Sequence, residues 1–224
     1  AYNNLKNSML KSVYENGGFY VGRYEAGIET TGTNRTSNTD KNSDGKYIMP
    51  SIAPVTKADA YPYTYVTRTQ AQNLASNVNS GTKTSSLMFG VQWDLVLAFM
   101  HNKGNIADST LTSNSTTIGN YKNNLWTIKN AKAQYSEDDG DTFTACPNPF
   151  KKESESEILL TTGADSSFSV QNIYDIAGNV CEWTLEKTSN TYDQCVARGG
   201  LFNDTGSYLS LIHISEPTRL ALIS

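Results

Sequence analysis

Three oxygen-bearing side chains lie close together in one largely apolar stretch, NIYDIAGNVCEWT (residues 172–184). They are Asp175, Asn179 and Glu182, and they alternate with residues typical of a protein interior. Gly178 permits an unusual backbone angle, so a turn could direct the Asn179 amide, the Glu182 carboxylate and nearby carbonyl groups at one point. Calcium binds about six to eight such oxygens. The alternative, which the residues alone favour, is a buried turn in which Asn179 and Glu182 satisfy backbone groups.

Other metal and catalytic chemistries have little support. His101 is the only histidine before residue 209, whereas a histidine-ligated zinc or iron site needs two or three. Neither a nucleophile motif nor a glycine-rich phosphate loop is present. The cysteines are Cys146, Cys181 and Cys195. They do not form a disulfide framework, although their spacing leaves a pair between the last two open. We predict buried thiols and no catalytic or cofactor-binding residue.

The composition limits the kinds of partner. The chain has 224 residues, of which 38% are hydrophobic and 18% charged, so it can form a packed core with a lightly charged surface. Its formal net charge of −4 argues against nucleic-acid binding, which needs a basic stripe. No apolar run reaches the ~20 residues of a membrane-spanning helix. We therefore expect neither a nucleic-acid partner nor a membrane span.

The last part of the chain, LSLIHISEPTRLALIS (residues 209–224), is unlike everything before it. It looks like the translation of a sequencing adaptor, and such a segment is excluded from fold reasoning. The alternative is a genuine C-terminal strand. We therefore predict a single domain over residues 1–208 that is incomplete at its C-terminus, followed by a tail that is no part of the fold.

Periodicity and turn residues predict a few regular elements separated by long polar loops. Helices are expected over residues 3–16, 67–78 and 85–100. Thr67 and Gln70 fit a capping box at the start of the second helix. The third is apolar nearly all round from Val91 to Met100, which predicts a buried helix with Trp93 in the core. Strands are expected over residues 19–29, 167–170 and 196–200.

Two acidic loops could hold a cation but are better explained as turns. Residues 40–45, DKNSDG, begin like an EF-hand loop, yet the twelfth position is Ser51 instead of the bidentate glutamate that such a loop requires. Residues 137–141, EDDGD, form an acidic cluster for which a solvated turn is the expected structure.

Three segments occur in an order and approximate spacing typical of one family. They are GGFYVGRYEAGIE (residues 17–29), SSLMFGVQWDLVLAFM (residues 85–100), and NIYDIAGNVCEWT followed by VARGG (residues 196–200). The chain thereby resembles the sulfatase-modifying factor family, also called the formylglycine-generating enzyme domain, as a divergent member. The hallmark of that family reads approximately Tyr-Asp-Met-Ala-Gly-Asn-Val-Trp-Glu-Trp-Thr. Residues 174–184, hereafter the hallmark segment, match it with Ile176 for methionine and Cys181 for tryptophan.

The resemblance implies an α+β fold of the irregular C-type-lectin-like kind, with two main helices, short twisted antiparallel strands and much loop. It also implies a calcium ion at the hallmark segment, with Asn179 and Glu182 as the residues carried over to it. The catalytic members of the family use copper held by two cysteine thiolates after the Arg-Gly-Gly, and soft thiolates suit Cu(I). Residues 201–208 contain no cysteine, Cys195 precedes Arg198, and Cys181 replaces a tryptophan. Copper is therefore not expected in this chain.

Two functions from different classes follow. The first is a non-catalytic binding module of a bacterial or phage surface protein, because loops on a rigid frame suit recognition and the loops here are rich in Asn, Ser, Thr and Tyr. Its ligand would be a protein, a peptide or a glycan. The alternative is an oxidase that converts a protein cysteine to formylglycine and whose metal ligands follow the present sequence.

Overall fold

The described residues form short elements joined by long loops. The computed structural model describes residues 2–29, 43, 52–78, 83–187 and 196–207. Most of the EF-hand-like stretch at 40–45, together with Ser51, Cys195 and the predicted tail at 209–224, lies outside these residues.

Four α-helices occur in the described part of the chain. They are α1 (Tyr2–Asn16), α2 (Arg68–Ser76), α3 (Gly90–Gly104) and α4 (Asp108–Thr112), with the short 3₁₀ helices η1 (Thr116–Ile118) and η2 (Ser166–Phe168). The predicted capping box is confirmed, because the Thr67 hydroxyl accepts from the Gln70 N–H and the Gln70 side chain accepts from the Thr67 N–H. None of these helices is long and apolar enough to cross a membrane.

The strands pair in small antiparallel sheets. The pairs are β1 (Gly27–Ile28) with β2 (Tyr61–Pro62), β3 (Thr127–Ile128) with β6 (Phe150–Lys151), β8 (Ser169–Val170) with β9 (Ile173–Tyr174), and β10 (Glu182–Trp183) with β11 (Ala197–Arg198). A three-stranded sheet orders β5 (Thr144–Ala145), β4 (Gln134–Ser136) and β7 (Leu159–Leu160). The fold is therefore α+β with short antiparallel strands, as predicted. The long strand expected over residues 19–29 was wrong, since only Gly27–Ile28 pairs there.

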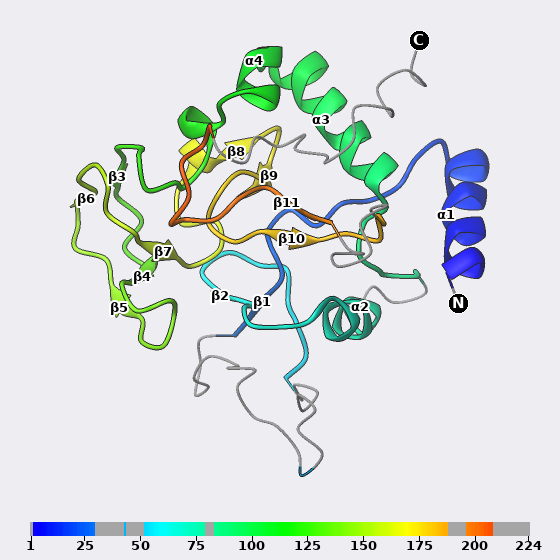
Figure 1. Cartoon of the computed structure of the whole chain (residues 1–224), viewed down its shortest axis with the longest axis horizontal. Helices are drawn as coiled ribbons and strands as arrows, with labels where there is room; N and C mark the ends of the chain where they lie inside the picture. The colour runs from blue at the N-terminus through cyan, green and yellow to red at the C-terminus, as the bar shows by residue number, and fades with distance from the viewer. Residues whose placement is uncertain (1, 30–42, 44–51, 79–82, 188–195, 208–224) are drawn as a thin grey trace.

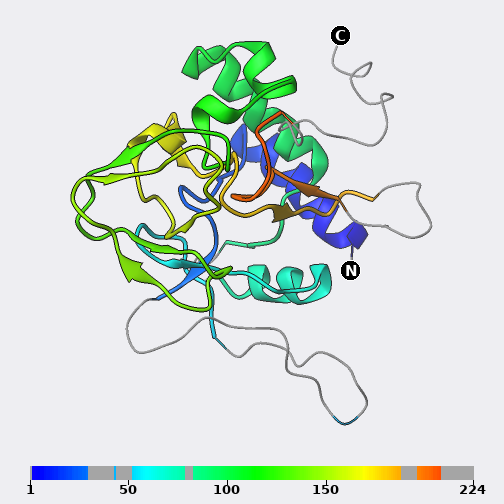
Figure 2. The ribbon, with the colours of Figure 1, turned by 60° about the vertical axis from the view of Figure 1, so that its left-hand side comes forward.

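Two apolar clusters make up the core. In the first cluster, Trp93 and Met100 of α3 pack together with residues of the hallmark segment such as Ile176 and Ala177. The other surrounds Trp126 and contains Ile128, Leu160 and Phe168. The α1 helix and the β3–β7 segment lie at opposite ends of the long axis (Figure 1). The turned view shows α3 and α4 above the paired strands (Figure 2).

The α3 helix differs from its prediction. It begins at Gly90 instead of near residue 85, and Val91, Leu95 and Phe99 are 49%, 46% and 44% exposed. These residues are spaced four apart and therefore share one face. The helix is apolar on both faces but covered on only one, because it lies at the edge of the molecule (Figure 1). The expectation of a helix buried all round was wrong, whereas Trp93 is fully buried as predicted.

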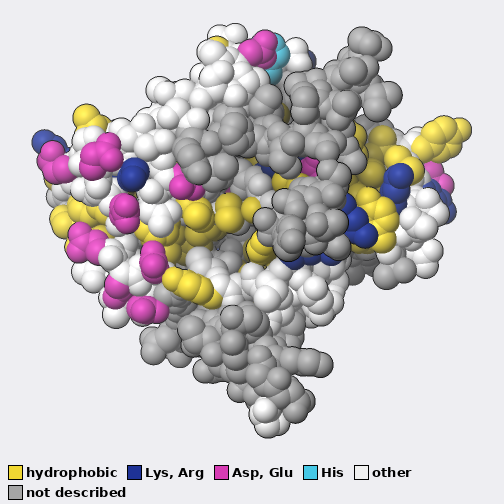
Figure 3. Space-filling view, viewed as in Figure 1, with side chains coloured by type: hydrophobic (Ala, Val, Ile, Leu, Met, Phe, Trp, Pro, Cys, Tyr) yellow, Lys and Arg dark blue, Asp and Glu magenta, His cyan; other side chains and the backbone are white. Residues whose placement is uncertain are grey.

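Acidic side chains gather at the end of the molecule that carries β3–β7 (Figure 3). The turn at 137–141 has its own structure, as expected: both Asp138 carboxylate oxygens accept hydrogen bonds, from Ser136 and from the Thr142 N–H and hydroxyl. These bonds lower the pKa of Asp138 to about 2. The aspartate therefore closes the turn.

Candidate functional site

The hallmark segment folds into a tight turn against residue 120. Asp175, Gly178 and Asn179 have positive φ angles of 57°, 70° and 59°. The Asn179 N–H donates to the Asn120 carbonyl at 2.8 Å. A Cβ at residue 178 would run into the backbone of Asn120, so only glycine allows this approach. The turn thereby fixes where the Asn179 side chain points.

The Asn179 side chain is 1% exposed and its hydrogen-bonding capacity is used within the protein. Its oxygen accepts from Asn120 Nδ2 at 3.1 Å and from the Leu160 N–H at 3.0 Å. Its amide nitrogen donates to Glu25 Oε2 at 2.8 Å and to the Leu160 carbonyl at 3.2 Å. One asparagine therefore ties together four segments that are far apart in the sequence.

Three carboxyl groups interact electrostatically at this turn, and one of them, Glu25, accepts from Asn179. Glu25 Oε1 accepts from the Val180 N–H at 3.4 Å, and Asp175 Oδ2 accepts from the Gly163 N–H at 2.5 Å. Glu182 Oε2 is buried and has no hydrogen-bond partner in the described part of the chain. We call Glu25, Asp175 and Glu182 the carboxyl cluster. The sequence pattern singled out Asp175 and Glu182. Glu25 lies in a segment more than a hundred positions earlier in the chain.

Burial and mutual repulsion favour the protonated forms of the carboxyl cluster. Loss of hydration raises the pKa of Asp175 to about 7. Loss of hydration and the charge of Asp175 raise the pKa of Glu25 well above its usual value. Loss of hydration and the charge of Glu25 do the same for Glu182. A neutral cluster satisfies the rule that buried charges need a partner.

The carboxyl cluster predicts a fall in stability with rising pH. A carboxyl whose folded pKa is raised contributes its full stability below the unfolded pKa of about 4 and loses it as the pH approaches the folded value. For Asp175 this window runs up to about 7. We therefore expect a higher melting temperature near pH 5 than near pH 8 in thermal melts, and a weaker dependence in Asp175→Asn. A melting temperature that rises with pH in both proteins would contradict a protonated cluster.

The network continues from Asn179 into the second apolar cluster. Asn120 Nδ2 donates to the Ile158 carbonyl at 2.8 Å, and Trp126 Nε1 donates to Asn120 Oδ1 at 3.1 Å. The Tyr121 hydroxyl donates to the Gly199 carbonyl at 2.7 Å. Residues 120–126 are thus held by side chains on both sides. These contacts were not predicted, because residues 120–126 have the composition typical of a polar loop.

Lys152 holds the same segment from the other side. It is 3% exposed, and its ammonium donates to the carbonyls of Tyr121, Lys122 and Asn124 at 2.8, 2.8 and 3.0 Å. Burial lowers its pKa to about 8, while Glu155 acts in the opposite direction. The lysine therefore fixes the loop at 121–124 and is not available to a ligand.

A buried ion pair fixes the Arg-Gly-Gly segment. Arg198 Nη2 and Nε donate to Glu186 Oε2 at 2.5 and 3.2 Å, and Asp94 Oδ1 lies 3.8 Å from Arg198 Nη2. Arg198 is 3% and Glu186 5% exposed. Removing one partner of such a pair leaves an uncompensated charge inside the protein. Arg198 therefore has a structural role.

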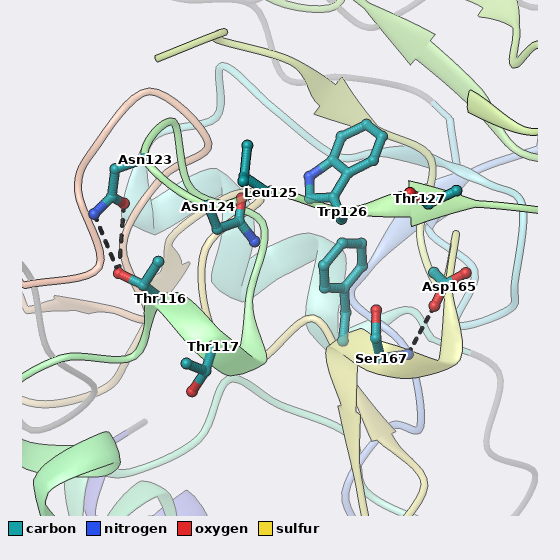
Figure 4. A pocket seen from close by; sticks show the side chains of 10 residues that line it. Thr116, Thr117, Asn123, Asn124, Leu125, Trp126, Thr127, Asp165 and Ser167 are labelled. Atoms are coloured by element: carbon teal, nitrogen blue, oxygen red, sulfur yellow. Dashed lines mark hydrogen bonds between the residues drawn. The ribbon is translucent and has the colours of Figure 1, made fainter. Parts of the chain in front are cut away.

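An open pocket of about 490 Å³ lies between η1, the loop before β3, and η2. It is lined by Thr116, Thr117, Asn123, Asn124, Leu125, Trp126, Thr127, Asp165, Ser167 and Phe168. Figure 4 shows Trp126 between Thr116 and Asn123 on one side and Asp165 and Ser167 on the other. Most lining groups are neutral and polar. This surface was not predicted as a site, although it is built from the Asn- and Thr-rich loops expected to contact a ligand.

The two residues predicted to bind calcium differ in their fit. Both oxygen lone pairs of Asn179 already accept hydrogen bonds, so in this arrangement Asn179 does not fit a calcium ligand. Glu182 keeps one buried carboxylate oxygen without a partner, which does fit. No group of three or more His, Cys, Asp or Glu side chains in the described residues is arranged to hold a metal ion.

The described thiols are in environments that disfavour thiolate chemistry. Cys146 is buried in the second apolar cluster, and burial raises its pKa to about 11. Burial likewise raises the pKa of Cys181, with Asp204 and Glu25 adding to the effect. Since the thiolate is the metal ligand and the nucleophile, neither cysteine is prepared for that chemistry.

The chain was compared with protein-family models, with curated proteins and with solved structures, and nothing matched it.

Proposed function

We propose that this chain is a divergent sulfatase-modifying-factor-like domain with a C-type-lectin-like fold, and that it serves as a non-catalytic binding module of a bacterial or phage surface protein. The observation that carries the proposal is that the buried hallmark segment uses its polar groups inside the protein, whereas the loops direct theirs to the surface. Polar groups of the hallmark segment bond to other segments inside the protein, as Asn179 does to Asn120, Leu160 and Glu25. Polar groups of the loops at 116–127 and 165–168 open instead into a surface pocket. Loops carried by a rigid frame are typical of recognition.

The alternative, an oxidase of the formylglycine-generating type, receives less support from these residues. Copper at such a site would need thiolates, and burial raises the pKa of both Cys146 and Cys181. The two have different surroundings, since Cys146 is buried in the cluster around Trp126 and Cys181 is half-buried in the hallmark segment.

An oxidation assay tests this choice. A cysteine-containing peptide of the kind found in sulfatases is incubated with the chain, Cu(I), a reductant and oxygen, and its mass is followed. We expect the cysteine to stay unchanged, as it does in a parallel reaction without protein. Conversion to formylglycine by the wild-type chain, lost in both Cys181→Ser and Cys195→Ser, would overturn the non-catalytic proposal.

Calcium at the hallmark segment stays a prediction with a distinct signature. A cation next to Glu182 Oε2 would satisfy that oxygen and offset the burial and the mutual repulsion that raise the pKa values of Glu25 and Glu182. Protons do the same at low pH, so calcium should raise the melting temperature near pH 8 and have little effect near pH 5. Glu182→Gln, which keeps the shape of the side chain, should lose the response. An equal response in Glu182→Gln would place the ion elsewhere.

A further inference from the structure

We propose that the pocket between η1, residues 123–127 and η2 binds a neutral sugar unit of a glycan. This inference rests on the proposed function and names the ligand class and the site. The pocket volume, about 490 Å³, falls in the range of about 300–1,000 Å³ that is usual for small-molecule sites. It therefore suits one or two sugar rings.

The free polar groups of the pocket match a ligand rich in hydroxyl groups. The side-chain hydroxyls of Thr117, Thr127 and Ser167 line it, and none makes a hydrogen bond within the described part of the chain. Asp165 Oδ1 accepts from the Ser167 N–H at 2.9 Å, which leaves Oδ2 available. Hydroxyl groups both donate and accept, and a carboxylate only accepts. A sugar hydroxyl can pair with every one of these groups.

The charge of the pocket selects among ligands. Among the described residues that line it, Asp165 is the only charged one, and no lysine, arginine or histidine is present. Phosphate, sulfate or carboxylate groups would meet a carboxylate without a cation to offset it, and like charges disfavour such a contact. The charge of the pocket therefore favours a neutral ligand over a sialylated or phosphorylated one.

Apolar surface completes the match. Leu125 is 70% exposed at the rim of the pocket, and the rings of Trp126 and Phe168 pack edge to face beneath it with centroids 6.3 Å apart. Trp126 and Phe168 are 7% and 4% exposed and support the pocket from the core, whereas Leu125 presents its apolar side chain to solvent. The face of C–H groups of a sugar ring can lie on Leu125 while the hydroxyls turn to the polar groups.

The walls of the pocket are held in place before any ligand arrives. The Asn124 side chain accepts from the Tyr121 N–H at 3.3 Å and donates to the Gly119 carbonyl. The backbone carbonyl of Asn124 accepts from the Lys152 ammonium. The Trp126 ring is fixed through Nε1 by Asn120. At the wall formed by Asn123, its Oδ1 accepts from the Gly206 N–H. A preorganised site loses less entropy on binding, which favours weak polar ligands such as sugars.

The test is an NMR titration of the whole chain, labelled with ¹⁵N, with maltose, cellobiose, lactose and N,N′-diacetylchitobiose. Sialyllactose serves as the acidic probe and a Ser-, Thr- and Asn-rich peptide as the competing class. Ser167→Trp should fill the pocket, and Ser166→Trp is the matched control, because Ser166 is exposed on the same turn but does not line the pocket. Asp165→Asn keeps an oxygen for the Ser167 N–H but replaces the accepting Oδ2 by an amide NH2 that only donates, and it removes the charge.

We expect at least one neutral disaccharide to shift the resonances of residues 117, 125–127 and 165–168. Affinity should fall about tenfold or more in Asp165→Asn and in Ser167→Trp and stay unchanged in Ser166→Trp. Equal binding by all variants, or a preference for sialyllactose, would overturn the proposal. If the peptide binds and no sugar does, the sugar site is refuted while a binding module remains. If neither class binds, both proposals fail.

Discussion

Replacing Asn179 by alanine is expected to lower the free energy of unfolding by about 3–5 kcal/mol. The change removes four buried side-chain hydrogen bonds to Asn120, Leu160 and Glu25. A buried polar group left without a partner costs about 1–3 kcal/mol, and the Leu160 N–H and Glu25 would both be affected. The loss is large against the about 5–15 kcal/mol that keep a typical domain folded. Denaturant titration followed by circular dichroism measures it.

Asn102→Ala is the matched control for this prediction. Asn102 is exposed near the end of α3, where its side chain donates to the Ala98 carbonyl. A surface change of this kind should cost less than about 0.5 kcal/mol. If Asn179→Ala also stayed within that limit, Asn179 would not be the tie between segments that the structure indicates.

The second large effect is expected at Arg198. In Arg198→Met the carboxylate of Glu186 stays buried without the guanidinium that binds it at 2.5 and 3.2 Å. Breaking one side of a buried ion pair costs about 3–5 kcal/mol, so we expect the single variant to lose a stability of this size in the same denaturant titration.

Restoring balance should return most of that stability. The double variant Arg198→Met, Glu186→Leu removes both charges, and replacing a buried pair by apolar residues is often close to neutral. We therefore expect the double variant to be more stable than Arg198→Met alone. A double variant that is less stable than either single variant would mean that the two residues do not act as a pair.

Local patterns in the sequence predicted local structure well. The capping box at Thr67 and Gln70 predicted the start of α2 because the interaction spans only three residues. The leucine and methionine spacing over residues 3–16 predicted α1. The start and the exposed face of α3 were not predictable from periodicity, because an apolar stripe does not say whether a partner will cover it.

The contacts that build the frame depend on distant residues. Asn179 was singled out as a polar residue in an apolar segment, but its partner Glu25 lies 154 positions away. An acidic residue within the apolar stretch at 19–29 was the available signal for Glu25. No sequence pattern predicted the role of Lys152, because its three carbonyl partners lie about 30 residues away in a loop. Tertiary hydrogen bonds of this kind leave no periodic pattern.

The measurement that tests the account most directly is binding of the intact chain to arrays that carry glycans, peptides and proteins. The account predicts saturable binding to members of one ligand class, strongly reduced in Ser167→Trp and unchanged in Ser166→Trp, because the recognition surface lies on the loops. Absence of binding to every class, together with oxidation of a cysteine peptide by the same preparation, would contradict it.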